Sequence, residues 1–382
     1  MHRILFLTVG VGGGHIAPAR AMASALEARF PDRLAVEVVD LPRAAGASRI
    51  DERLNRAWIQ AARHPAPMRI LYWLLTRLPR TGLEFARWHY RELFEAGIPY
   101  LVSRSPDLVV STHPLCSMVA LEARADHGLR FPLLTYVVDP FDAYPWWAAR
   151  GVDLFLVASE EAREGLVRYD IDPSRIRIAP FPVRPEILTP SATREEVCLS
   201  LGLGPDLPVL LCTGGGMGLG KIGRYVEALV RARLPLNIVL LTGRNRALYE
   251  RMRPLSGPGS RLAVVEFTDR MADLYHTADL VVGKAGASTA MEALVVGRPM
   301  LFTEWIAQND YAIIRYFLDH GYGWYIPGVR DSLRFLSRAD LPARVAHARA
   351  RIQEAGFTTG VYQIADLIAS ILEGGGEPLP SA

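Results

Sequence analysis

The segment from Asp279 to Asp310 holds the residue types that bind phosphate groups. It begins with an apolar strand, residues 280–282, continues through a turn of small residues, 283–287, and then starts a helix at Ser288. A strand, a glycine turn and a helix in this order bring several free backbone N–H groups and the positive end of a helix dipole to one point. Such a point binds a phosphate or a diphosphate.

Three side chains of this segment suit the rest of a nucleotide-diphosphate-sugar. Lys284 adds a positive charge, the carboxylate of Glu292 can accept two ribose hydroxyls, and Gln308 is expected at the rim of the site. Two structural alternatives stay open. The pattern Thr289-x-x-Glu292 is also a capping box, in which the carboxylate binds a backbone N–H at the start of its own helix. Lys284 can equally be a solvated turn residue.

Size and composition exclude several classes of protein. A chain of 382 residues predicts two domains, and 50% apolar with 22% charged residues is typical of a globular protein rather than a disordered one. The net charge of +3 does not favour a nucleic-acid partner. Cys116, Cys198 and Cys212 have no paired spacing, which indicates a reducing compartment without disulfides or a zinc site. With no signal-peptide layout and no apolar run of membrane-spanning length, we expect a cytoplasmic protein, soluble or peripheral to a membrane.

The chain opens with a strand, a glycine loop and a helix. An apolar strand over residues 3–9 precedes Gly10-Val-Gly-Gly-Gly-His15, a helix follows over 17–30, and a second strand covers 35–39. This order predicts a βαβ unit of a parallel sheet. The glycine spacing is not that of a secure dinucleotide-binding fingerprint.

A second glycine-rich loop indicates a second domain of the same type. An apolar strand from Pro208 leads into Gly214, Gly215, Gly216 and Gly218, and a helix follows over 222–232. The two halves therefore predict an α/β protein of two Rossmann-like domains facing a cleft. The proline-rich passage 180–190 is the expected linker. The predicted parts are an amino-terminal domain of residues 1–184, a carboxyl-terminal domain of residues 185–359, and a helix packing back on the body with a frayed tail over residues 360–382.

Polar residues follow several strands of the amino-terminal half. His113, Asp139 and Ser159 each end an apolar strand, and the carboxyl ends of parallel strands are where open α/β sheets place ligand groups. Each of the three can equally be a turn residue or a helix cap. The pattern Asp170-x-Asp172 has the form of a metal motif, but its position before a proline predicts a turn and a helix cap.

Residues 43–104 differ from the sequence on either side. Arginines outnumber acidic residues there, and Trp58, Trp73 and Trp88 lie beside basic residues at roughly helical spacing. This mixture favours helices that lie in the interface of an anionic membrane. The alternative is a set of amphipathic helices that cover the sheet and leave their arginines in water.

The motifs follow one order over nearly the whole chain, and they are specific in combination. They are Gly12-Gly-Gly-His15, Ser111-Thr-His113-Pro114, Asp139, Ser159-Glu-Glu161, Pro182-Val183, Gly214-Gly-Gly, Gly243-Arg-Asn245, Lys284-Ala-Gly286, Ser288-Thr289, Glu292-Ala293 and Gln308. This order resembles the monogalactosyldiacylglycerol synthase and processive diacylglycerol glucosyltransferase family, which belongs to glycosyltransferase family 28 with the MurG-type enzymes. The resemblance implies a GT-B fold and an inverting transfer of a hexose from a UDP-sugar to a lipid acceptor at the cytoplasmic membrane surface. Diacylglycerol is the first choice of acceptor.

The resemblance also implies roles for individual residues, with the donor on the carboxyl-terminal domain and the acceptor on the amino-terminal one. The backbone at Phe267 meets uracil, Glu292 binds the ribose and Gln308 binds the sugar hydroxyls. The diphosphate falls at Gly214 to Gly218 and at Ser288 and Thr289. Arg244 and Lys284 offset the charge of the leaving UDP. The other donor-site residues are Asn245, Gly286 and Asn309, and the acceptor-site residues are Gly13, Gly14, His113, Tyr144 and Trp147.

Inverting transfer needs a base for the acceptor hydroxyl, and His15 and Asp139 are the candidates. A helix dipole with two cationic side chains can stabilise UDP as it leaves, so we expect no metal and no other cofactor. Two departures from the family pattern leave details open. Tyr144 replaces a histidine, which leaves the acceptor arrangement open, and Gln308-Asn309 replaces Gln-Glu, which leaves the sugar open.

Other functions fit the same motifs. One is a MurG-like transferase that uses another lipid-linked or hydrophobic acceptor. A second is a UDP-sugar 2-epimerase of the same fold, although the pair Gln308-Asn309 lacks the carboxylates that such a reaction needs around the sugar. A third is a sugar-nucleotide-binding protein without catalysis.

Overall fold

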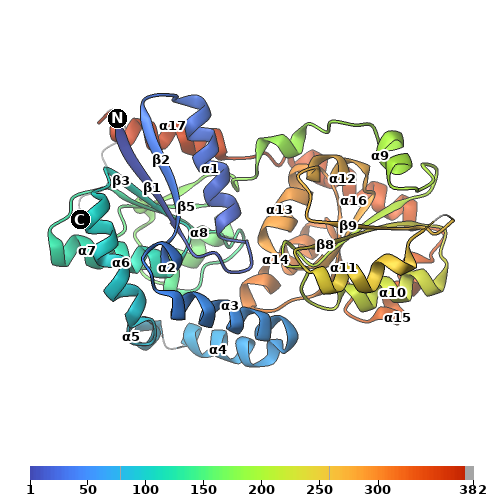
Figure 1. Ribbon diagram of the computed structural model, residues 1–382, viewed down its shortest axis with the longest axis horizontal. Coiled ribbons are helices and arrows are strands. Elements are labelled where there is room, and N and C mark those ends of the chain that lie inside the picture. Colours follow the sequence, from blue (N-terminus) through green and yellow to red (C-terminus); the bar gives the residue numbers. More distant parts are fainter. Residues whose placement is uncertain (78, 258, 375–382) are drawn as a thin grey trace. The chain divides into compact units, whose positions relative to one another are not determined.

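The computed structural model of the chain describes residues 1–77, 79–257 and 259–374. The chain forms two compact units (Figure 1). Unit 1 consists of residues 1–61, 66–184 and the segment that begins at Thr359, and unit 2 consists of residues 62–65 and 185–358. The tail expected after residue 374 lies outside the described residues.

Unit 1 is built on a six-stranded parallel sheet with the strand order β2-β1-β3-β4-β5-β6. Its strands are β1 (His2–Thr8), β2 (Leu34–Asp40), β3 (Leu108–Ser111), β4 (Leu133–Tyr136), β5 (Leu154–Val157) and β6 (Ile176–Ile178). Four successive residues of β1, from Ile4 to Leu7, are fully buried although they point to alternate faces. This is the pattern of a parallel strand that is covered by helices on both faces. Thr8 pairs with Asp40 and Leu7 pairs with Ser111, so the loops that follow these three strands leave the sheet at one edge.

Helices of unit 1 pack against this sheet and include most of the described part of the arginine-rich segment. They are α1 (Ile16–Arg29), α2 (Leu41–Ala44), α3 (Ser48–Arg63), α4 (Pro65–Arg77), α5 (Pro79–His89), α6 (Arg91–Arg104), α7 (Pro114–His127), α8 (Glu160–Val167) and α17 (Val361–Leu372), with 3-10 turns at Pro145–Trp147 and Pro173–Arg175. The carboxyl-terminal helix α17 lies beside α1 (Figure 1), where Asp366 forms an ion pair with Arg29. This ion pair joins the last helix of the chain to the first.

Unit 2 repeats the architecture with the strand order β12-β11-β10-β7-β8-β9, again parallel. Its strands are β7 (Val209–Thr213), β8 (Asn237–Gly243), β9 (Leu262–Glu266), β10 (Leu280–Lys284), β11 (Met300–Glu304) and β12 (Gly323–Tyr325). Its helices are α9 (Arg194–Ser200), α10 (Ile222–Ala232), α11 (Arg246–Met252), α12 (Met271–Thr277), α13 (Ala287–Val295), α14 (Gln308–His320), α15 (Val329–Leu336) and α16 (Leu341–Ala355), with 3-10 turns at Pro185–Leu188 and Arg253–Leu255.

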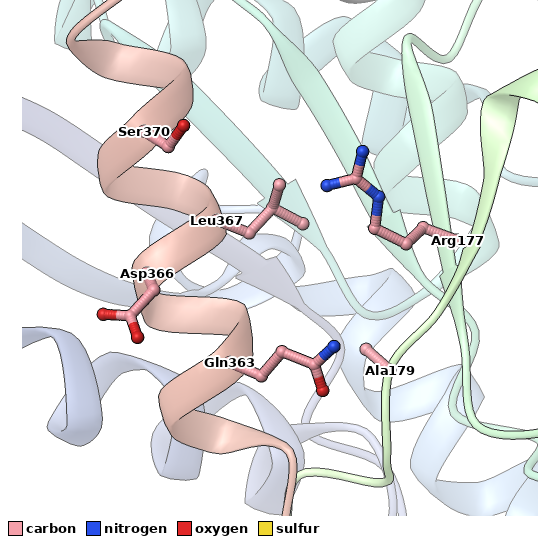
Figure 2. A pocket seen from close by; sticks show the side chains of 6 residues that line it. All are labelled: Arg177, Ala179, Gln363, Asp366, Leu367 and Ser370. Atoms are coloured by element: carbon pink, nitrogen blue, oxygen red, sulfur yellow. The ribbon is translucent and has the colours of Figure 1, made fainter. Parts of the chain in front are cut away.

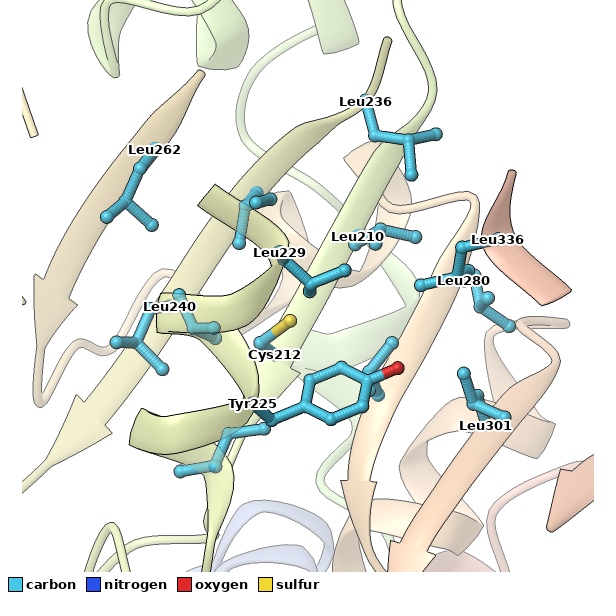
Figure 3. Packing of buried hydrophobic residues seen from close by; sticks show 14 of the residues in the cluster. Leu210, Cys212, Tyr225, Leu229, Leu236, Leu240, Leu262, Leu280, Leu301 and Leu336 are labelled. Carbon is cyan, nitrogen blue, oxygen red and sulfur yellow. The ribbon is translucent and has the colours of Figure 1, made fainter. Parts of the chain in front are cut away.

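One apolar core fixes the strand that leads into the second glycine loop. Leu210 and Cys212, two residues apart on β7, lie on one face of the sheet beneath Tyr225 and Leu229 of α10 (Figure 3). Successive side chains of a strand alternate between faces, whereas residues four apart on a helix share a face. The strand and the helix on either side of the loop are therefore held rigidly against each other.

Candidate active site

The loop from Gly214 to Lys221 joins β7 to α10 and turns tightly at the carboxyl edge of the sheet. The N–H of Gly215 donates to Thr213 Oγ1 at 3.0 Å, and the N–H of Gly218 donates to the Gly215 carbonyl at 2.8 Å. Gly218 has a φ of +55°, and a Cβ there would lie 2.1 Å from the Thr242 carbonyl oxygen. Only glycine fits at this position. The loop is thus a fixed shape rather than a flexible link.

The amino end of α13 has donors without acceptors. Gly286 is the N-cap and supplies no side chain. The N–H groups of Ala287, Ser288 and Thr289 donate to no acceptor in the described part of the chain. The Ser288 hydroxyl oxygen is buried, and it too has no partner among the described residues. Buried polar groups normally have partners, so these unpaired groups indicate a place for an anionic ligand.

Lys284 brings its charge to the same place. It is the last residue of β10 rather than part of the expected turn. Its Nζ lies 3.2 Å from the position that a Cβ on Gly286 would take, and 3.9 Å from the equivalent position on Gly215. The ammonium group therefore lies between the glycine loop and the start of α13, and the interpretation of Lys284 as a solvated turn residue is wrong.

The capping-box interpretation of Thr289 and Glu292 is also wrong. The helix begins at Ala287, so Thr289 is already its third residue and cannot be the N-cap. Glu292 instead accepts a hydrogen bond at 3.0 Å from the hydroxyl of Tyr275, which lies on α12 and is buried. The carboxylate is therefore positioned from a neighbouring helix, and it remains partly exposed to solvent.

Two further donor-site candidates lie at the ends of β8 and β9. The guanidinium of Arg244 lies over the ring of Phe267, 5.1 Å from its centroid, and Phe267 is 58% exposed. Asn245, predicted to bind the donor, uses both polar atoms of its side chain in hydrogen bonds to the backbone. Its Nδ2 donates to the Gly218 carbonyl at 2.9 Å, and its Oδ1 accepts from the Leu248 N–H at 3.0 Å as the N-cap of α11. Asn245 thus holds the glycine loop in place.

Gln308 and Asn309 form the first turn of α14, after β11. The Gln308 side chain is exposed, while that of Asn309 is partly buried. The helix start is fixed by Asp310, which accepts from the N–H groups of Ile306 and Ala307 at 2.9 and 3.1 Å. Of the two side chains, that of Gln308 is the more exposed to solvent.

In unit 1, His15 follows the glycine loop and its hydrogen bond defines its tautomer. Its Nδ1 lies 2.7 Å from the carbonyl oxygen of Thr112. A carbonyl can only accept, so Nδ1 carries the proton and Nε2 presents a lone pair. Burial lowers the pKa of His15 to about 4, an effect that the bond to Thr112 partly offsets. His15 is therefore a neutral imidazole near pH 7 and can accept a proton at Nε2.

His113 lies next to His15, with the two ring centroids 4.6 Å apart. It is the N-cap of α7, and its Nδ1 accepts from the Leu115 N–H at 3.2 Å. Burial lowers the pKa of His113 well below its usual value, and the neighbouring His15 adds to this effect. His113 is thus a helix cap, as one interpretation of the sequence expected, and its ring also contacts His15, the candidate base.

Asp139 and Trp147 form a buried pair beside these histidines. The Trp147 Nε1 donates to Asp139 Oδ2 at 2.6 Å; Asp139 is 6% exposed and Trp147 is fully buried. The ring of Trp147 lies 6.1 Å from that of His15 and 6.1 Å from that of Tyr144. Trp147 is therefore closed to solvent, whereas Tyr144 is partly exposed. The loop glycines Gly13 and Gly14 have open space where a Cβ would point.

Two of the candidate groups proved to be structural, and two important residues were missed. Ser159 is the N-cap of α8, and Asp172 accepts from the Ser174 N–H at 2.9 Å as the expected helix cap. Among the residues that the structure describes, no three His, Cys, Asp or Glu side chains gather as a set of metal ligands. The missed residues are Tyr275, which has no signal in the sequence, and Glu304. Glu304 ends β11, so the rule that drew attention to other strand-end residues applies to it too.

The expected membrane-facing segment exposes large apolar side chains on both α4 and α5. We call these side chains the α4–α5 surface; they are Ile70, Leu71, Trp73, Leu74, Phe85 and Trp88. Trp88 is 71% exposed, and the guanidinium of Arg77 lies over the ring of Trp73. Trp58 does not belong to this surface, because it packs against the glycine loop at Gly12. Within the described ranges, no helix has the length and the hydropathy needed to cross a bilayer.

A pocket of about 300 Å³ lies elsewhere in unit 1, between α17 and β6. Figure 2 shows Gln363 and Leu367 of α17 pointing toward the strand that carries Arg177. None of the candidate site residues lines it. The pocket therefore adds nothing to the site described above.

Family models match both units of the chain. A monogalactosyldiacylglycerol (MGDG) synthase model matches residues 15–183, and a glycosyltransferase family 28 C-terminal domain model matches residues 209–327. Together these two domain matches show that the chain is similar to the monogalactosyldiacylglycerol synthases of glycosyltransferase family 28. It is therefore a glycosyltransferase, and the resemblance seen in the sequence is confirmed.

Known proteins of this kind are similar to the glycosyltransferase over most of its length. The probable monogalactosyldiacylglycerol synthase 2, chloroplastic, of Oryza sativa subsp. japonica is 28% identical over 347 residues, which cover 88% of this chain and 73% of the relative. Among solved structures, MurG of Acinetobacter baumannii is similar with a TM-score of 0.60 at 15% identity, over 97% of this chain and 100% of MurG. The UDP-GlcNAc 2-epimerase from Neisseria meningitidis, solved bound to UDP-GlcNAc, has a TM-score of 0.59 at 12% identity, over 97% and 100% of the two chains.

These structural similarities bear on the fold alone. They confirm the predicted GT-B class with two Rossmann-like domains, because MurG and this glycosyltransferase share it over their whole lengths. Since an epimerase has the same fold, the fold does not separate transfer from epimerisation. That separation depends on the family and on the site.

Proposed function

We propose that this glycosyltransferase moves a hexose from a UDP-sugar to diacylglycerol, with inversion at the anomeric carbon, at the surface of an anionic membrane. The observation that carries the donor part is the amino end of α13. Three N–H groups and the Ser288 hydroxyl, none of which has a partner among the described residues, converge there with the ammonium of Lys284. Donors and a cation at a helix start suit the two phosphates of a nucleoside diphosphate.

The nucleoside end of the proposed donor follows from Glu292, Arg244 and Phe267. Glu292, held by Tyr275, would accept the two ribose hydroxyls. The exposed pair Arg244 and Phe267 lies at the neighbouring strand ends, where uracil would meet the backbone. Gln308 would bind hydroxyls of the sugar. A structure of the same fold with UDP-GlcNAc bound supports the nucleotide class.

The proposed chemistry is a single displacement. The acceptor hydroxyl oxygen bonds to the anomeric carbon as the bond from that carbon to the diphosphate oxygen breaks. The hydroxyl proton passes to His15 Nε2, which is free to accept it because Nδ1 donates to Thr112. UDP departs toward the α13 dipole, Lys284 and Arg244, which offset its developing charge. This scheme calls for no metal.

The acceptor and its location are supported by the family and by the α4–α5 surface. Diacylglycerol is insoluble in water, so the enzyme that uses it must work at a membrane. Exposed tryptophans beside arginines suit the interface of an anionic bilayer, and Trp73 and Trp88 are 55% and 71% exposed. The cysteines Cys116, Cys198 and Cys212 are unpaired, which supports the cytoplasmic, reducing side of that membrane.

Incubation of the purified protein with radiolabelled UDP-galactose or UDP-glucose, with and without diacylglycerol vesicles, tests the proposal. We expect labelled glycolipid that forms only when diacylglycerol is present, with a β-linked sugar by NMR if the donor is the α-anomer. Glycolipid formed only from another lipid-linked acceptor would indicate a MurG-like transferase. A UDP-sugar converted to its 2-epimer without transfer would replace the proposal with the epimerase alternative, which the fold similarity permits.

A further inference from the structure

Glu304 is a carboxylate at the edge of the proposed diphosphate site. It is the last residue of β11 and pairs in register with Lys284, the last residue of β10. Its backbone carbonyl accepts from the Ala285 N–H at 2.9 Å. A negative charge beside a diphosphate site opposes ligand binding by simple repulsion. Its presence there therefore needs a physical reason.

The side chain of Glu304 fastens the far end of the glycine loop. Its Oε1 accepts from the backbone N–H of Lys221 at 2.7 Å. Lys221 is the N-cap of α10 and makes no side-chain cap, so this bond satisfies a donor at the start of that helix. A Cβ on Gly220, whose φ is +91°, would lie only 2.1 Å from Glu304 Oε1. The loop can approach the carboxylate this closely only because residue 220 is glycine.

The cations around Glu304 are Lys284 of the proposed site and Lys221 at the end of the glycine loop. Burial raises the pKa of Glu304, while the Lys221 N–H and the charges of Lys221 and Lys284 pull it down. No acidic group acts on it among these influences. The carboxylate thus faces the two lysines and the loop.

In unit 1, a strand-end carboxylate likewise accepts from a backbone N–H of the glycine loop. Asp40, the last residue of β2, accepts from the Gly10 N–H at 3.1 Å, and a Cβ on Gly10 would lie 2.4 Å from Asp40 Oδ2. In both units, a carboxylate at the end of another strand of the same sheet thus accepts from a backbone N–H of the glycine loop and lies close to one of the loop's glycines.

We propose that Glu304 is a positioning residue for the donor: it pins the loop of Gly214 to Lys221 in the shape that receives the diphosphate, acting through the accepting oxygen rather than through its charge. The proposal rests on the proposed donor site in unit 2. If it holds, an uncharged side chain with the same accepting oxygen must serve as well as glutamate. Removal of the oxygen must loosen the loop although it also removes a repulsive charge.

Calorimetric titration of UDP into the wild type, Glu304→Gln and Glu304→Ala tests the proposal. We expect Glu304→Gln to bind UDP within about twofold of the wild type or more tightly, and Glu304→Ala to bind roughly tenfold more weakly, since the hydrogen bond that holds the loop at Lys221 is lost. The donor KM should rise in Glu304→Ala while kcat at saturating donor changes little. Glu227→Ala is the matched control, because its carboxylate lies on the next helix and pairs with Arg251.

The outcomes separate this proposal from the proposed function. If Glu304→Ala binds UDP as tightly as the wild type, Glu304 has no positioning role. If both variants bind UDP more tightly than the wild type, the only effect of Glu304 is the repulsion by its charge, and the positioning role is again overturned. If the wild type itself binds no UDP, the proposed donor site fails and this proposal fails with it. Thermal unfolding of each variant checks that a weakened affinity does not come from a loss of the folded state.

Discussion

The hydroxyl of Tyr275 donates to Glu292 Oε2 at 3.0 Å, and this bond joins α12 to α13. Tyr275 is only 1% exposed, so the bond fixes the carboxylate from the interior of unit 2. Because Gly286 caps α13, the carboxylate is not used to begin its own helix. A carboxylate can accept about four hydrogen bonds, and the bond from Tyr275 uses one of them.

Glu292→Gln should weaken UDP binding strongly and leave the fold intact. The substitution keeps the size of the side chain but removes the charge that strengthens bonds from ribose hydroxyls. We expect a loss of about 1.5 to 3 kcal/mol in binding free energy. Calorimetric titration measures the affinity, and thermal unfolding measures the stability.

Glu250→Gln is the control for this experiment, since Glu250 is a solvent-exposed carboxylate on α11 that pairs with Arg246. It should leave UDP affinity unchanged. If Glu292→Gln binds UDP like the wild type and lowers only the melting temperature, the carboxylate is a structural group and the ribose contact must be abandoned.

The imidazole of His15 should act as a base over an unusually wide range of pH. Its pKa is lowered to about 4 by burial, so the form with a free Nε2 lone pair predominates above that pH and is lost below it. We expect kcat/KM to rise with pH through a midpoint near 4 and to stay level from about 5.5 to 8 as far as this group is concerned. A midpoint near 6.5, the value of an unperturbed histidine, would contradict this assignment.

His15→Ala should lower turnover far more than donor affinity. A positioned general base contributes about 10² to 10⁴ in rate, whereas the diphosphate site lies in the other unit. Measured kcat and UDP affinity of the variant check this directly. A variant that turns over normally but binds UDP weakly would remove His15 from the proton-transfer step.

Gly218→Ala should damage both stability and donor binding. The new methyl group would collide with the Thr242 carbonyl, and a φ of +55° is unfavourable for alanine. Strain of this kind costs about 1 to 3 kcal/mol. Gly204→Ala is the control, because no atom lies within 4 Å of its Cβ position and its φ is not positive. Denaturant unfolding of both variants, followed by UDP titration, tests the prediction; a Gly218→Ala protein as stable as the control would contradict it.

The double substitution Trp73→Ala and Trp88→Ala should weaken binding to vesicles that contain anionic lipid. Both side chains are exposed on the α4–α5 surface, so their loss should cost little stability. We expect binding of the wild type to fall with added salt, because the arginines nearby act through screened charges. Leu199→Ala, a 61% exposed apolar residue of α9 in unit 2, is the control. If the wild type does not float with the vesicles, or if its flotation is insensitive to salt, α4 and α5 are amphipathic helices that cover the sheet and face water.

Much of the architecture could be predicted because short, unbroken apolar runs alternate with glycine and proline. The predicted bounds of the helix at residues 222–232 are those of α10. The runs of β1 and β7 are buried on both faces, which only a parallel sheet under two layers of helices explains. The expected fold class is confirmed for this reason.

The site was harder to predict because caps and hydrogen bonds depend on the fold. The pattern Thr289-x-x-Glu292 has the spacing of a capping box. However, Gly286, with its extended backbone, is the N-cap, so the helix begins at Ala287 and Thr289 cannot cap it. Trp147, predicted at the acceptor, is fully buried and donates to Asp139, a contact that no sequence pattern indicates. The contact between Tyr275 and Glu292 joins residues 17 positions apart on two helices, so no local pattern reveals it.

A crystal of this glycosyltransferase soaked with UDP tests the central claim most directly. The account predicts that the diphosphate lies on the N–H groups of Ala287, Ser288 and Thr289 beside Lys284, with the ribose hydroxyls on Glu292. UDP bound elsewhere, or the start of α13 closed by protein side chains in the soaked crystal, would contradict it.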